Sequence, residues 1–134
     1  METKPTNIIV KVILDTNFLL VPVTLGVDVF TLIREFDPSA ELFVVDKTLD
    51  ELKKIQAEQR KFREAASIAA QLVKQQNIKV IKTEKNKNTD QIIAETAEKH
   101  KCVVATQDRG LKALLRQKQI PIIILRQKKY IRLE

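Results

Sequence analysis

The sequence predicts an α/β fold built around a central parallel sheet, on the basis of three observations. Five short apolar runs rich in Val and Ile occur along the chain, at residues 8–14, 42–45, 78–81, 102–105 and 120–125. Such runs are typical of strands that are buried on both faces, and segments with helical periodicity separate them. Strands that alternate with helices imply parallel neighbours joined by right-handed crossovers. Acidic residues recur just beyond several runs, at the edge of the sheet where α/β proteins place their functional sites.

The helices are predicted between these strands, in chain order. Residues 27–36 show helical spacing of apolar positions, and Asp28 is the expected N-cap. Residues 47–76 are expected to hold two helices, because the apolar positions at their start stop before an Ala-rich stretch. Residues 88–100 and 109–119 supply the last two helices. No helix is predicted between Asp15 and residue 27.

The chain length of 134 residues favours one domain, covering residues 1–134. A short basic C-terminal strand or tail is expected from about residue 126. Its sequence, RQKKYIRLE, alternates charged and apolar residues enough for an edge strand, but it suits a basic extension equally well.

Composition and charge exclude several classes of protein. The N-terminal sequence lacks a signal-peptide pattern, and no apolar stretch approaches the roughly 20 residues of a membrane span, so we expect a cytoplasmic protein with no membrane partner. The lone Cys102 cannot form a disulfide within the chain, and the lone His100 argues against a zinc site or a histidine-based triad. A net charge of +7 suits a polyanionic substrate, although a basic housekeeping domain would show the same surplus.

Four acidic residues follow the predicted strands at one end of the sheet: Asp15, Glu51, Asp90 and Asp108. Each has a structural alternative. Asp15 could hold a turn, Glu51 stands at capping-box spacing from Thr48, Asp90 falls in the first turn of a helix capped by Asn88 or Thr89, and Asp108 could cap a helix. Helix caps would cluster at this end of the sheet too. Caps do not explain Asp15, however, because no helix is expected after it.

A cluster of carboxylates is costly unless a cation neutralises it. Two like charges 4 Å apart repel by about 1 kcal/mol in water and by about 4 kcal/mol at an effective dielectric constant of 20. No Lys or Arg falls beside Asp15 at the strand end, whereas Mg²⁺ and Mn²⁺ take oxygen ligands directly. The expected chemistry is phosphodiester hydrolysis that is assisted by Mg²⁺ or Mn²⁺ and needs no covalent protein nucleophile.

The segments that carry these acids, ILDTNFLL, VVDKTLDEL, NTDQII and VVATQDRGLK, resemble the PIN domain family of metal-dependent nucleases. Within the family, the chain looks most like archaeal relatives of the PIN endonuclease that processes small-subunit ribosomal RNA. The resemblance implies a three-layer α/β/α sandwich with strand order 3-2-1-4-5. It also implies that Asp15, Glu51, Asp90 and Asp108 are the catalytic, metal-binding quartet, and that Asn17 and Thr106 orient carboxylates or water beside the metal.

The predicted function is that of a divalent-metal-dependent endoribonuclease in ribosomal RNA processing. Single-stranded or irregular RNA is the expected substrate, because it can enter a carboxylate crevice more readily than a duplex. An aromatic stacking platform is not expected, since the chain has one Tyr, no Trp and five Phe that look mainly like core residues. The candidate contacts to the RNA backbone are basic: Lys53, Lys54, Lys85, Lys87, Arg109, Lys112, Lys128 and Lys129.

Three other functional classes stay open at this point. A ribonuclease toxin with an antitoxin partner shares this fold and chemistry, and a non-catalytic RNA-binding factor in ribosome assembly would keep the basic surface without cleavage. A phosphoacceptor signalling domain also carries acids at strand ends, but it generally needs an acidic pair at the first strand and a Lys after the last. This chain disfavours that class, because its first strand offers only Asp15 and its last run leads into Arg126. Other partners to expect are ribosome assembly factors and, since PIN domains often pair, a second copy of the chain.

Overall fold

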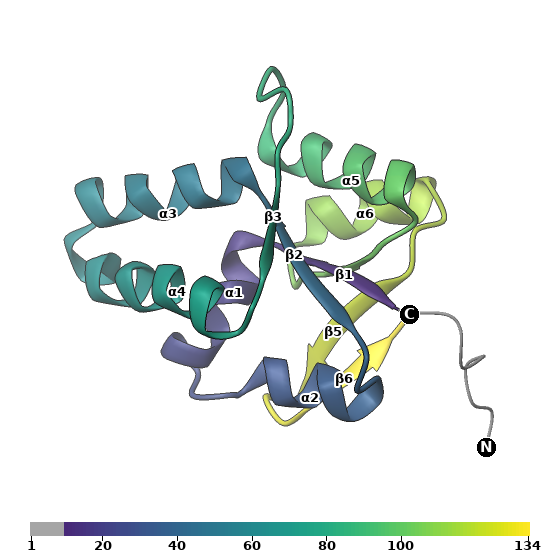
Figure 1. Ribbon diagram of the computed structural model, residues 1–134, viewed down its shortest axis with the longest axis horizontal. Coiled ribbons are helices and arrows are strands. Elements are labelled where there is room, and N and C mark those ends of the chain that lie inside the picture. The colour runs from purple at the N-terminus through teal and green to yellow at the C-terminus, as the bar shows by residue number, and fades with distance from the viewer. Residues whose placement is uncertain (1–9) are drawn as a thin grey trace.

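A computed structural model describes residues 10–134 and shows a sheet of six strands in the order β3-β2-β1-β4-β5-β6 (Figure 1). The strands are β1 Lys11–Leu14, β2 Glu41–Val45, β3 Lys79–Ile81, β4 Val103–Ala105, β5 Ile122–Arg126 and β6 Tyr130–Leu133. The first five are parallel, and β6 pairs antiparallel with β5. The predicted class and strand order are therefore confirmed, with the C-terminal tail added as an edge strand. Residues 8 and 9 of the first predicted strand lie outside the described part of the chain.

Helices cover both faces of this sheet. They are α1 Thr16–Thr24, α2 Val29–Phe36, α3 Asp46–Glu58, α4 Arg63–Gln75, α5 Thr89–His100 and α6 Arg109–Gln117, with a short 3-10 helix, η1, at Arg60–Phe62. One core cluster packs α1 to α4 against Val12 and Leu14 of β1, and a second packs α5 and α6 against Ile13. Alternate residues of β1 thus enter opposite layers, as expected for a strand that is buried on both faces.

Helix α1 is an element that the sequence analysis did not predict. Asp15 is its N-cap, and the Asp15 carboxylate accepts a hydrogen bond of 2.6 Å from the Phe18 amide. The argument that no cap could explain Asp15 is therefore wrong. The helix was not predicted because its sequence, TNFLLVPVT, is apolar around most of its circumference and contains Pro22, so it shows no amphipathic period.

Other caps agree with the sequence more closely. Asp28 caps α2 and Asn88 caps α5, each accepting a hydrogen bond from a backbone amide of the first turn. The capping-box alternative for Glu51 is wrong, because α3 begins at Asp46 and places Glu51 in its second turn. Within residues 10–134 no single helix is long and apolar enough to cross a membrane; α1 and α2 meet that criterion only as a pair bent by 114°.

Candidate active site

The carboxyl ends of the central strands bring the four candidate acids to one place. Leu14 of β1 is in register with Ala105 of β4, and the Asp15 amide donates to the Ala105 carbonyl at 3.2 Å. Asp15 follows β1 directly, and Asp108 stands at the start of α6, just beyond β4. Glu51 comes from α3 and Asp90 from the first turn of α5. The sheet order, together with the helices that follow β2 and β3, therefore explains how residues so distant in the sequence become neighbours.

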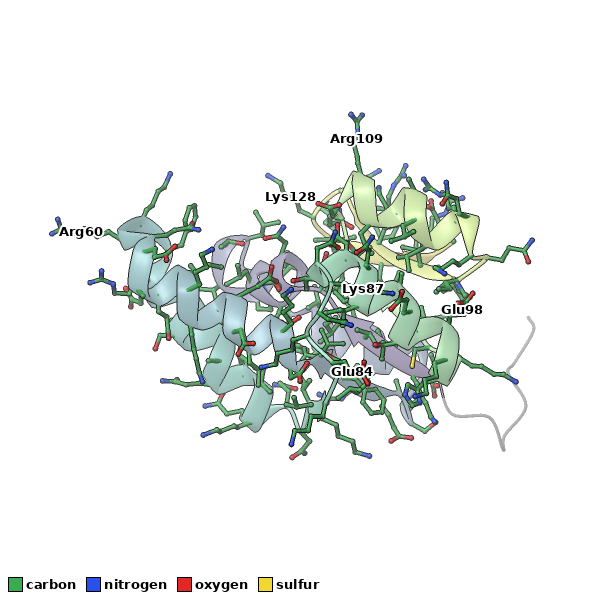
Figure 2. All side chains as sticks on the ribbon, turned by 90° about the horizontal axis from the view of Figure 1, so that it is seen from above. Arg60, Glu84, Lys87, Glu98, Arg109 and Lys128 are labelled. Atoms are coloured by element: carbon green, nitrogen blue, oxygen red, sulfur yellow. The ribbon has the colours of Figure 1, made fainter. Side chains whose placement is uncertain are left out.

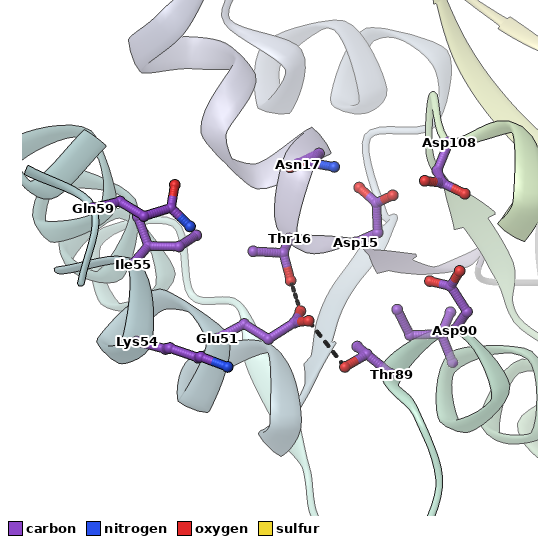
Figure 3. A pocket seen from close by; sticks show the side chains of 11 residues that line it. Asp15, Thr16, Asn17, Glu51, Lys54, Ile55, Gln59, Thr89, Asp90 and Asp108 are labelled. Carbon is purple, nitrogen blue, oxygen red and sulfur yellow. Dashed lines mark hydrogen bonds between the residues drawn. The ribbon is translucent and has the colours of Figure 1, made fainter. Parts of the chain in front are cut away.

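All four carboxylates line one cavity of about 370 Å³ (Figure 3). Asp15, Asp90 and Asp108 lie near one another at one end, while Glu51 enters from the α3 side. Asn17 also lines the cavity. The remaining lining residues are Thr16, Lys54, Ile55, Gln59, Thr89 and Ile93.

Burial sets the electrostatics of Asp15, which is only 5% exposed. Its burial raises its pKa from 3.8 to about 6, against the lowering effect of hydrogen bonds from the Thr106 hydroxyl and the Phe18 amide. The negative charges of Asp108 and Asp90 contribute smaller parts of the same rise. The pKa of Asp90 is also raised, first by burial and then by Asp108 and Glu51. Charge on these carboxylates is therefore disfavoured until a cation approaches.

Hydroxyl groups hold the carboxylates in place. Thr106 is fully buried, donates to Asp15 and accepts a 3.0 Å hydrogen bond from the Asp108 amide, so it links two of the acids. Thr16 donates to Glu51 at 2.5 Å and Thr89 donates to the other Glu51 oxygen at 3.1 Å. Thr106 was expected beside the acids from the sequence. Thr16 and Thr89 were not expected to contact Glu51, although each directly adjoins a candidate acid in the sequence.

Asp108 both caps a helix and lines the cavity. Its carboxylate accepts a 2.7 Å hydrogen bond from the Leu111 amide and so caps α6, as the structural alternative proposed. It is nevertheless exposed and lines the cavity. Asp50, the neighbour of Glu51, instead pairs with Lys85 at 2.7 Å and is not among the cavity residues.

The donor set fits a hard divalent cation. The carboxylates, hydroxyls and the Asn17 amide all offer oxygen, which suits Mg²⁺ or Mn²⁺. Among residues 10–134, no three carboxylate, imidazole or thiolate groups converge tightly enough to form a ready-made metal cluster. Mg²⁺ is commonly held by one or two carboxylates and keeps several waters, so an open carboxylate cavity of this kind suits it. Asp15, Glu51, Asp90 and Asp108 are the residues that could hold it.

The predicted RNA contacts lie on several elements, and one of them, Lys54, lines the cavity. Lys54 lines the cavity, and Lys53 is exposed beside it on α3. Arg109 and Lys112 lie on the first turns of α6, and Figure 2 shows Arg109 projecting from the surface. Lys128 and Lys129 are exposed in the turn between β5 and β6. Lys85 and Lys87 are engaged with acids, Lys85 with Asp50 and Lys87 with Glu95 at 2.5 Å.

The chain matches a known protein family and is similar to two ribonucleases. A family profile described as "PIN like domain" matches residues 12–128. The chain belongs to this PIN-like domain family. It is 32% identical over 123 residues to Ribonuclease VapC9 of Archaeoglobus fulgidus, covering 91% of the chain and 87% of that protein. It is 27% identical over 122 residues to Ribonuclease VapC4 of Methanocaldococcus jannaschii, covering 90% of the chain and 93% of that protein.

Solved structures agree with this PIN assignment. The PIN domain endonuclease Utp24 superimposes with a TM-score of 0.76 at 27% identity, over 92% of this chain and 90% of that one. A domain of a functionally unknown protein from Methanocaldococcus jannaschii shares the fold with a TM-score of 0.64 at 18% identity, over 86% of this chain and 90% of that one. The PIN chain described here thus has ribonucleases among its relatives and an endonuclease among its structural neighbours.

Proposed function

We propose that this PIN protein is a divalent-metal-dependent endoribonuclease that hydrolyses single-stranded or irregular RNA. The observation that carries the proposal is the convergence of Asp15, Glu51, Asp90 and Asp108 on one cavity, in a chain whose relatives are ribonucleases. When bound there, Mg²⁺ or Mn²⁺ supplies Lewis-acid chemistry, neutralising charge on the phosphate and making water more acidic.

The protein's own residues supply position and charge. Thr106 and the Phe18 amide fix the Asp15 carboxylate, while Thr16 and Thr89 fix Glu51, so the acids are oriented before the metal or RNA arrives. No step requires a protein nucleophile. The single histidine, His100, ends α5 and lies away from the cavity, and the hydroxyls of Thr16 and Thr89 are already bonded to Glu51.

The test is cleavage of a labelled unstructured RNA in Mn²⁺ by the wild-type protein and by Asp108→Asn. Asn can still accept the Leu111 amide hydrogen bond and cap α6, so the fold is retained while one negative charge is lost. We expect cleavage to fall by at least about 100-fold, as for removal of a strong electrostatic contact at an active site. Asp50→Asn, which changes the same residue type outside the cavity, is the matched control. Equal cleavage by all three proteins would reject the site.

We favour a toxin-type ribonuclease with an antitoxin partner over the ribosomal RNA processing role that the sequence suggested. The two relatives are described as ribonucleases, and the chain aligns with 87% or more of their lengths. The likeness to Utp24 supports an endonuclease without specifying ribosomal RNA. Growth arrest on expression of the wild type, but not of Asp108→Asn, would support the toxin role. Altered precursor ribosomal RNA without arrest would support the processing role.

A further inference from the structure

The helical arm made by α3, η1 and α4 ends in a basic tip, whose residues beyond Gln59 do not line the carboxylate cavity. We define the arm tip as residues 59–63, which join α3 to α4 through η1. Arg60, Lys61 and Arg63 are exposed there, and Phe62 keeps 39% of its surface exposed. Phe18 and Phe30 are buried, as expected for core residues, but Phe62 and Phe36 are not, so the expectation of mainly core-like Phe is only partly correct.

The carboxylate cavity extends along α3 toward this tip. Glu51, Lys54, Ile55 and Gln59 all line it, at spacings that place them on one face of the helix. Eight residues of α-helix span about 12 Å, so the cavity leads from the acids to the first residue of the tip. Figure 3 shows Gln59 at the side of the cavity opposite Asp108, and Figure 2 shows Arg60 projecting from the end of the arm.

The basic and aromatic side chains of the arm tip suit the binding of a nucleic acid strand. Residues 53–64 carry five basic side chains against two acidic ones, Glu58 and Glu64. The Lys61 ammonium lies over the Phe62 ring, 5.5 Å from its centroid, so a cation and an aromatic face stand together. The Arg63 Nε donates to the Gln56 carbonyl at 2.8 Å and ties the tip to the end of α3. Cationic side chains beside an exposed aromatic ring are the elements from which single-strand binding surfaces are made.

We propose that the arm tip binds the part of a single-stranded RNA that runs out of the carboxylate cavity along α3. In this arrangement Phe62 stacks on a base, while Arg60, Lys61 and Arg63 contact phosphates. This proposal rests on the nuclease function, because the RNA is taken to run from the carboxylate cavity to the tip. It extends that function by assigning to the arm tip the selection of flexible RNA over duplex RNA. A base can stack on Phe62 only where it is free of a partner strand.

The test measures equilibrium binding of fluorescently labelled oligouridine to the full chain in EDTA, so that binding does not depend on cleavage. Phe62→Ala should weaken binding about tenfold and leave its salt dependence unchanged, since stacking releases no counterions. The double variant Arg60→Gln with Lys61→Gln should weaken binding and reduce the slope of log affinity against log salt by about 1.4, or about 0.7 per phosphate contact.

Matched controls distinguish the effect of the arm tip from the effect of losing any exposed aromatic ring or any two positive charges. Phe36→Ala removes an exposed aromatic from α2, and Lys99→Gln with Lys101→Gln removes two charges at the end of α5 remote from Asp90. We expect both controls to bind oligouridine with nearly the affinity of the wild type, whereas the tip variants bind it more weakly. In Mn²⁺, the tip variants should raise the KM for RNA cleavage and leave kcat largely unchanged.

The outcomes distinguish this proposal from the nuclease proposal. Tip variants that bind and cleave like the wild type would overturn the role of the tip and leave the nuclease function intact. Selective loss of RNA binding in the tip variants, with no cleavage by any protein, would support the tip and reject the nuclease function. Tip variants that lose affinity for polyglutamate but keep it for oligouridine would also overturn the proposal, since the tip would then be a surface for an acidic protein.

Discussion

Asp15 is a buried carboxylate whose negative charge is disfavoured by the fold in the absence of a cation. Its pKa is about 6 in the folded protein, raised mainly by burial, and near 3.8 in an unfolded chain. Between these values the folded state binds more protons than the unfolded state, so the stability of the metal-free protein falls as pH rises from about 4 to about 6. Above that range the full penalty, about 3 kcal/mol, is present.

Asp15→Asn should therefore raise the free energy of unfolding of the metal-free protein at pH 7, by up to about 3 kcal/mol, and should have little effect near pH 3. The Asn side chain can still accept the Phe18 amide hydrogen bond that caps α1. Urea unfolding in EDTA at several pH values measures the effect. Asp28→Asn is a control of opposite sign, because hydrogen bonds from Thr31 lower the pKa of Asp28. A less stable Asp15→Asn at pH 7 would contradict the prediction.

Thr16 is expected to act on the site through Glu51 alone. Thr16→Val keeps the shape of the side chain but removes the hydroxyl that donates to Glu51 at 2.5 Å. The concentration of Mn²⁺ needed for half-maximal cleavage should rise about 10- to 100-fold, the usual cost of losing a group that orients a metal ligand. Thr24→Val is the matched control on the same helix, since its hydroxyl donates to the Leu20 carbonyl at 3.1 Å and Thr24 does not line the cavity. The same metal requirement in both variants would remove Thr16 from the site.

At the scale of elements, the sequence predicts what its local patterns encode and misses what depends on tertiary contacts. The strands and the caps of α2 and α5 follow from apolar runs and from Asp28 and Asn88. Helix α1 has no polar face for periodicity to detect, and the bonds from Thr16 and Thr89 to Glu51 join different elements. The four acids could be grouped beforehand because the ends of parallel strands meet at one edge of a sheet.

The turn of the β5–β6 hairpin could not be predicted from the sequence. Gln127 and Lys128 both have positive φ, at 53° and 54°, and the Lys129 amide donates to the Arg126 carbonyl at 3.0 Å. Positive φ at two consecutive residues is the pattern of a type I′ turn, for which Asn-Gly is the preferred sequence. The pair Gln-Lys gives no such signal, which is why the tail could be predicted only as a strand or an extension.

Replacing this pair with Asn-Gly, by Gln127→Asn and Lys128→Gly, should stabilise the protein by about 1 kcal/mol, because it relieves a left-handed backbone at a side chain with a Cβ. Thermal unfolding measures the change. Gly26→Ala is the reverse control: Gly26 has φ of 69° and space for a Cβ, so the added methyl introduces only backbone strain and should destabilise. Loss of stability in the Asn-Gly variant would show that Lys128 contributes a contact that outweighs its backbone strain.

At the scale of the whole molecule, a net charge of +7 surrounds a cavity lined by four carboxylates. The basic surface favours the approach of RNA, while the acids repel a phosphate until a cation is present. Folding itself assembles this acidic cavity, because its four acids come from α3, α5 and the N-cap positions of α1 and α6 and are far apart in an unfolded chain. Metal affinity and folding stability are therefore coupled in this protein.

Mn²⁺ should consequently stabilise the folded chain, by about 2.7 kcal/mol at a concentration 100 times its dissociation constant. The shift should be much smaller in Glu51→Gln and Asp108→Asn, which each remove one charge from the cavity, and unchanged in Asp50→Asn, whose carboxylate pairs with Lys85 instead. Thermal unfolding at increasing Mn²⁺ measures this without any RNA. An equal rise in Tm for all four proteins would mean that the ion binds elsewhere, and the cavity would then lose its assignment as the metal site even if the protein cleaves RNA.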